Sequence, residues 1–154
     1  MKIYDCFMFF DEEMILDLRL NILDKYVDKF IITEATYMHS GKPKKLLFDI
    51  NKYSKFKDKI IYIVVDKSPS DLIKINEKDT ENEKNSKKNL NAYRRHIHQL
   101  EETRQGISNA NPEDIIIIGD LDEIPNLEKI DFKTINQKLI FFRQKMFYYK
   151  LNLF

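Results

Sequence analysis

Short apolar runs recur along the chain and are separated by longer segments in which apolar residues return at helical spacing. The runs are rich in Ile, Val and Phe, and they are Cys6–Phe10, Phe30–Thr33, Ile60–Val65, Ile115–Ile118 and Leu139–Phe142. Because polar residues do not alternate with the apolar ones, the runs predict strands that are buried on both faces, as in a parallel sheet covered by helices.

Two helices are predicted between these strands. The first is expected to be capped by Asp11 and to carry an apolar face made of Met14, Ile15, Leu18, Ile22 and Tyr26. The second is expected to present Leu90, Tyr93, Ile97, Leu100 and Ile107 on one face. Alternation of strands and helices predicts an α/β fold with a mostly parallel, Rossmann-type sheet flanked by helices.

Composition narrows the class of protein. The 154 residues are 43% hydrophobic and 33% charged, which predicts one globular domain over residues 1–154. The formal net charge is only +1, so no overall field favours nucleic acid. The single cysteine, Cys6, cannot form an internal disulfide, and no stretch approaches the about 20 apolar residues of a membrane span. A cytoplasmic protein is therefore expected.

Three of the predicted strands run into acidic residues, which are Glu34, Asp66 and Asp120. Ligands of open α/β sheets bind beyond the carboxyl ends of the strands, so these acids are expected at the binding crevice. Asp120 and Asp122 are two residues apart and would project to the same side of an extended backbone. Pro125 is expected to end the strand.

Two carboxylates on one side repel each other unless a cation or a proton neutralises them. Mg²⁺ and Mn²⁺ prefer oxygen ligands and are commonly held by one or two carboxylates, with substrate phosphates and water completing the shell. The motif thus predicts a metal-bridged diphosphate. The plainer interpretation is a solvated turn, because aspartate is common in turns.

Four blocks of the sequence resemble glycosyltransferase family 17. They are Ile3–Phe10, Val27–Tyr37 with Ser40–Pro43, Pro112–Pro125, and Lys145–Tyr149 with Leu151 and Asn152. The resemblance implies a GT-A-like nucleotide-binding fold, a UDP-sugar donor, most simply UDP-N-acetylglucosamine, and inversion at the anomeric carbon. It also implies that the acceptor is a glycan or another hydroxyl compound.

The resemblance also implies roles for individual residues. Asp120 and Asp122 match the family's acidic motif and would hold Mn²⁺ or Mg²⁺ against the diphosphate. The residues that match a block expected to line the donor pocket are Glu34, Ser40, Gly41 and Lys42. A general base must deprotonate the acceptor hydroxyl, and the candidates are Glu123 and Glu34.

This chain departs from the family pattern in two places. Members usually carry a Gln-Arg pair before the acidic strand, where this chain has Gln99-Leu100, and they continue beyond the final block, so a C-terminal part is expected to be lacking. One alternative is therefore a shortened domain that binds a sugar nucleotide without turnover, or that forms a homodimer through its final strand. Another is a phosphatase of the haloacid dehalogenase type, although the Asp-x-Asp motif of that class normally follows the first strand.

Overall fold

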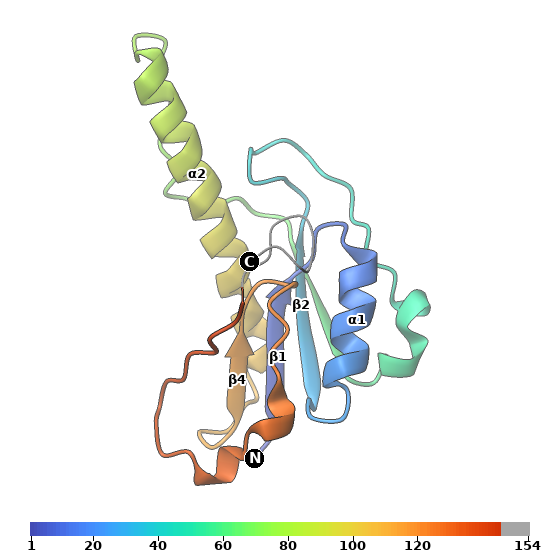
Figure 1. Ribbon diagram of the computed structural model, residues 1–154. Helices are drawn as coiled ribbons and strands as arrows, with labels where there is room; N and C mark the ends of the chain where they lie inside the picture. The colour runs from blue at the N-terminus through green and yellow to red at the C-terminus, as the bar shows by residue number, and fades with distance from the viewer. Residues whose placement is uncertain (146–154) are drawn as a thin grey trace.

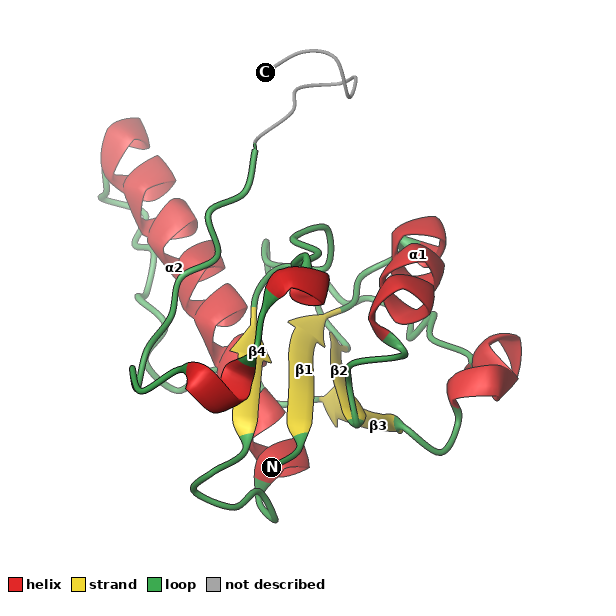
Figure 2. Ribbon diagram, turned by 60° about the horizontal axis from the view of Figure 1, so that its bottom comes forward, coloured by secondary structure: helices red, strands yellow, loops and turns green. Residues whose placement is uncertain are grey.

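The computed structural model describes residues 1–145 and contains a four-stranded, all-parallel sheet. The strands are β1 (Ile3–Met8), β2 (Lys29–Ala35), β3 (Ile60–Val65) and β4 (Ile115–Ile118). The helices are α1 (Glu13–Leu23) and α2 (Glu81–Glu101), with short 3-10 turns η1 (Ile50–Phe56), η2 (Glu102–Ile107), η3 (Leu127–Lys129) and η4 (Phe132–Thr134). This arrangement confirms the predicted α/β class, with helical elements on both faces of the sheet (Figures 1 and 2).

The order of the strands in the sheet is β3-β2-β1-β4. The first three strands are laid down side by side in one direction, and the chain then returns to the other side of β1 to add β4 (Figure 2). The order of strands therefore reverses between β1 and β4. Such a reversal leaves a crevice at the carboxyl ends of the two strands, which is the usual place for ligands in this class of fold.

Alternate side chains of the strands enter two separate cores. On one face, Phe7, Phe30 and Ile32 pack against α1 through Leu16 and Leu20. On the other face, Tyr4, Cys6, Ile31 and Ile63 pack near η2 and the segment after it. Cys6 is fully buried as expected, and burial raises the pKa of its thiol to about 12, so the thiol remains protonated.

The predicted apolar face of the first helix is wrong at three of its five residues, while Ile15 and Tyr26 pack partly buried against the core. Met14, Leu18 and Ile22 are exposed, whereas the inner face of α1 is formed by Leu16, Arg19, Leu20 and Leu23. The pattern misled because the helix buries an arginine in the middle of its inner face. The N-cap is Glu12, with no side-chain capping bond, in place of the predicted Asp11.

The second helix also differs from its prediction. Leu90 and Tyr93 are exposed, and the buried residues of α2 are the polar Asn91 and Gln99. Asn91 exchanges two hydrogen bonds with the backbone of Ile73, at 2.7 and 2.8 Å, so a polar loop covers this part of the helix. The N-terminal part of α2 extends away from the sheet (Figure 1).

The predicted strands differ in how well they match. Ile60–Val65 and Ile115–Ile118 are confirmed at the predicted bounds, while β1 begins earlier than predicted. Leu139–Phe142 is not a strand, and Leu139 and Phe141 are 70% and 85% exposed. The expected final strand and its dimer contact involve residues 146–154, which lie outside the described part of the chain.

Candidate functional site

A cavity of about 700 Å³ opens where β1 and β4 end, at the reversal of strand order. One wall comes from the segment after β1 and the start of α1, and another from the segment after β4. Two more come from the loop after β2 and from the C-terminal half of α2. The lining residues are Met8, Phe9, Phe10, Glu12, Ile15, Met38, His39, Ser40, His96, Gln99, Asp120, Leu121 and Asp122.

The segment after β4 forms a tight turn over Asp120–Glu123. The Glu123 amide donates to the Asp120 carbonyl at 3.0 Å, and the Glu123 carboxylate accepts from the Asp120 amide at 3.0 Å. Gly119 lets this carboxylate fold back, because a Cβ at that position would lie 2.9 Å from Glu123 Oε2. The backbone is therefore a turn rather than the extended strand that the sequence argument assumed, and Glu123 serves to close it.

Asp120 and Asp122 nevertheless line the same cavity, and both residues are exposed. Within residues 1–145, neither carboxylate forms a hydrogen bond or an ion pair with another side chain. Two unengaged carboxylates in one cavity are a donor set that fits a hard divalent cation. No group of three or more His, Cys, Asp or Glu side chains suited to a metal occurs in that range, so further ligands would have to come from substrate and water.

A buried arginine lies beneath this turn. The Arg19 guanidinium forms two hydrogen bonds with the Asp5 carboxylate, at 2.8 Å each, and neither side chain has any exposed area. Its Nη1 atom also donates to backbone carbonyls of the acidic turn, of which the nearest is that of Asp120 at 2.7 Å. This pair has no direct sign in the sequence, because an arginine on the inner face of a helix looks like a break in an apolar pattern.

Two histidines that line the cavity are in contact with each other. The ring centroids of His39 and His96 are 5.3 Å apart, with the rings edge to face. Partial burial lowers the pKa of His39, the charge that His96 can carry lowers it further, and Asp120 acts in the opposite direction. His39 is therefore mainly neutral near pH 7. Neither histidine was among the predicted site residues.

The loop that carries His39 is tied to α2. Arg95 donates through Nη1 to the His39 carbonyl at 3.0 Å, and Gly41 packs against the same guanidinium. Gly41 has a φ of +87°, a conformation that glycine adopts without strain. The contact explains why the loop turns sharply at this glycine, although Gly41 itself does not line the cavity.

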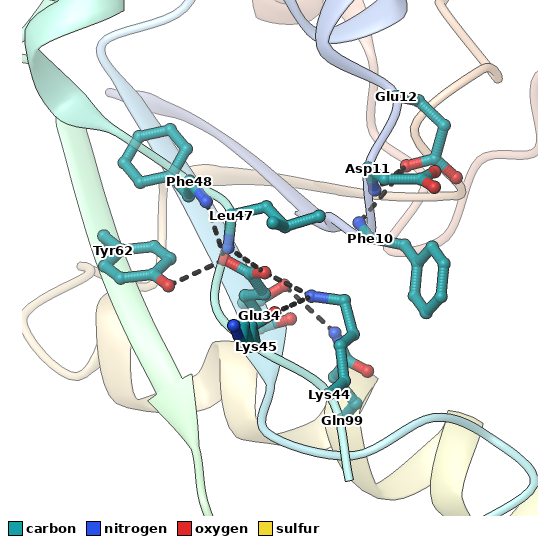
Figure 3. Close-up of polar contacts among 11 residues, drawn as sticks. Phe10, Asp11, Glu12, Glu34, Lys44, Lys45, Leu47, Phe48, Tyr62 and Gln99 are labelled. Atoms are coloured by element: carbon teal, nitrogen blue, oxygen red, sulfur yellow. Dashed lines mark hydrogen bonds and ion pairs between the residues drawn. The ribbon is translucent and has the colours of Figure 1, made fainter. Parts of the chain in front are cut away.

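Glu34 does not reach the cavity. Its side chain is fully buried, and it accepts hydrogen bonds from the Leu47 amide at 2.8 Å, the Phe48 amide at 3.0 Å and the Tyr62 hydroxyl at 2.8 Å. It also pairs with the ammonium group of Lys44 (Figure 3). Burial and the bond to Glu34 raise the pKa of the Tyr62 phenol, so Tyr62 stays a donor. Glu34 thus fastens the segment after the loop to the sheet.

Of the remaining residues that the sequence singled out, some line the cavity and others do not. Ser40 lines the cavity, whereas Lys42 is exposed and lies outside the lining. Gln99 is buried against the cavity and donates to the Thr33 carbonyl at 3.0 Å. Glu12 is a lining acid that the sequence argument missed, since it resembled an ordinary acid in the first turn of a helix.

Comparison with known proteins gives one match. The model of a family described as glycosyltransferase family 17 matches residues 1–153. No curated protein matches the chain, and neither does any solved structure. Within residues 1–145, no helix combines the length and the apolar character needed to cross a bilayer.

Proposed function

The chain belongs to glycosyltransferase family 17, and on that basis we propose that it is a metal-dependent, inverting transferase with a UDP-sugar as donor. The sugar is N-acetylglucosamine in the simplest case, and the acceptor is the hydroxyl group of a glycan. One observation carries the proposal. The carboxylates of Asp120 and Asp122, which have no hydrogen-bond or ion-pair partner among residues 1–145, line a cavity at the reversal of strand order.

In this reaction the acceptor oxygen attacks the anomeric carbon, and the bond from that carbon to the diphosphate oxygen breaks. The leaving UDP gains negative charge as this bond breaks. A Mn²⁺ or Mg²⁺ ion held by Asp120 and Asp122 would stabilise that charge. The cavity of about 700 Å³ is within the usual range for a small-molecule site.

The acceptor's proton must pass to a base. Glu34 is occupied by Lys44 and three further donors, and Glu123 closes the acidic turn, so neither carboxylate faces the cavity. Apart from Asp120 and Asp122, the titratable residues that line the cavity are Glu12, His39 and His96. We assign the base to His39, because its lowered pKa keeps the imidazole neutral and able to accept a proton.

Isothermal titration of UDP with and without Mn²⁺ tests the metal site. We expect Mn²⁺ to increase UDP affinity at least tenfold, equivalent to about 1.4 kcal/mol, and Asp122→Asn to abolish the increase. The matched control is Asp66→Asn, which changes an acid at the end of β3 that is outside the cavity lining. Equal affinity with and without metal, or an unchanged Asp122→Asn variant, would refute the proposal.

The stereochemical course has its own test. Proton NMR during turnover of an α-linked UDP-sugar should show a β-linked product at the earliest times. An α-linked product would contradict inversion while leaving the metal site intact.

Two alternatives make different predictions. A domain that binds sugar nucleotide without turnover would show metal-dependent UDP binding and no transfer to any acceptor. A dehalogenase-type phosphatase would hydrolyse an aryl phosphate. However, its acidic motif normally follows the first strand, whereas Asp120 follows β4.

A further inference from the structure

The acidic turn rests on one fully buried side chain. Arg19 projects from the inner face of α1 into the space between the sheet and the turn. Its guanidinium carbon lies 4.7 Å from the centre of the Phe7 ring, and its Nε and Nη2 atoms both bind the Asp5 carboxylate. These contacts therefore fix the position and the plane of the guanidinium independently of its contacts with the turn.

The outer nitrogen of this group binds the turn itself. Arg19 Nη1 lies 2.7 Å from the carbonyl oxygen of Asp120, 3.0 Å from that of Leu121 and 3.2 Å from that of Glu123. The three carbonyls belong to residues on both sides of Asp122. Because all three carbonyls bind one nitrogen, their peptide planes are held in fixed directions. These peptide groups belong to the turn that carries the Asp120 and Asp122 side chains.

The charge of the pair also suits a cation site. Asp5 neutralises Arg19, so the turn receives strong hydrogen bonds from a guanidinium without a net positive charge beneath it. An arginine is needed for this task, because its planar fork can bind a carboxylate on one side and carbonyls on the other. A lysine ammonium would be a single point of charge in place of that fork.

We propose that Arg19, held by Asp5, is a positioning residue of the transferase site, which aims the Asp120 and Asp122 carboxylates into the cavity. The role in catalysis rests on the function proposed above. The structural part does not, since it concerns only the geometry of the turn.

The first test measures the turn without any ligand. Amide hydrogen exchange at Asp120, Glu123 and Ile124 should accelerate at least tenfold in Arg19→Lys, while exchange at Ile32 in the centre of β2 should be unchanged. Arg104→Lys is the matched control, since Arg104 is exposed on η2. Unchanged protection of the turn in Arg19→Lys would overturn the proposal, whatever the protein binds.

The second test measures Mn²⁺-dependent UDP affinity in the same variants. We expect a loss of at least tenfold in Arg19→Lys and none in Arg104→Lys. A double variant, Asp5→Leu with Arg19→Met, replaces the buried pair by apolar side chains and so removes the fork without leaving a buried charge. This double variant should be folded, as a cooperative unfolding transition would show, and should nevertheless lose the Mn²⁺-dependent affinity for UDP.

The two tests separate the possible failures. If the wild-type protein shows no metal-dependent UDP binding, the proposed function fails, and amide exchange alone then decides whether Arg19 orders the turn. If wild type binds and a folded double variant binds equally well, the positioning role is wrong and the proposed function stands.

Discussion

Single side chains around the cavity have different tasks because their surroundings differ. Glu34 follows the apolar run Phe30–Thr33 within β2 and Asp120 comes after β4, yet Glu34 is surrounded by donors and Asp120 is open to the cavity. The sequence shows an acid after an apolar run in both cases and contains no sign of the Lys44 ammonium that folds back on Glu34. Asp120 and Asp122 line one cavity as the sequence led us to expect, although through a turn and not an extended strand, and their role as metal ligands stays a prediction.

The titration of His39 should report its neighbours. We expect NMR to give a pKa below the usual 6.5 for this imidazole. His96→Asn should raise the pKa, because a repelling charge is removed, and Asp120→Asn should lower it, because an attracting charge is removed. Asp66→Asn serves as the control. If Asp120→Asn leaves the pKa of His39 unchanged, the acidic turn lies too far from His39 for the two to share a site.

Glu34→Gln should affect stability rather than sugar-nucleotide binding. The change leaves the Lys44 ammonium, whose side chain is only 6% exposed, without its carboxylate. Breaking a buried ion pair on one side costs about 3–5 kcal/mol, which urea unfolding should reveal. UDP affinity of the folded variant should remain that of wild type. If stability is kept and transfer is lost, Glu34 acts as the base that the sequence first suggested.

The helices were harder to predict than the strands. Continuous apolar runs such as Phe30–Thr33 have one simple explanation, burial on both faces, and the structure confirms it for this run, although β4 is buried only at Ile117 and its Ile118 is 57% exposed. Helical periodicity depends on which face meets the core. In α1 the buried face includes Arg19, whose partner Asp5 lies in another element, and in α2 the apolar Leu90 and Tyr93 are exposed while the polar Asn91 and Gln99 are buried. Neither circumstance is visible in a local pattern.

The conformation of the loop after β2 should depend on Gly41. A Cβ there would meet Arg95 Nη2 at 2.7 Å, and the left-handed backbone costs a non-glycine residue about 1–2 kcal/mol. Gly41→Ala should therefore destabilise the protein by about that amount in urea unfolding and weaken UDP binding, since the same loop carries His39 and Ser40. Lys45→Ala is the control. Unchanged UDP affinity in Gly41→Ala would show that this loop is not part of the donor site.

The whole chain should become more stable when the cavity is filled. A ligand at about 100 times its dissociation constant stabilises the native state by about 2.7 kcal/mol. For a chain of this size, that corresponds to a rise in Tm of about 5–11 °C. Thermal unfolding should show this rise with Mn²⁺ and UDP together, and a much smaller one with either alone. A rise of equal size in Asp122→Asn would show that the ligand binds elsewhere.

The pairing of the first strand with the last has a consequence for biosynthesis. Lys2 and Asp114, 112 residues apart, are joined by a hydrogen bond of 2.6 Å where β1 and β4 begin. While the ribosome is still making the middle of the chain, β1 has a partner on one side only, and its other edge can pair with foreign strands. The pocket itself cannot exist until β4 has emerged and docked. Nucleotide retention by nascent chains should therefore begin abruptly, near the end of translation of this segment.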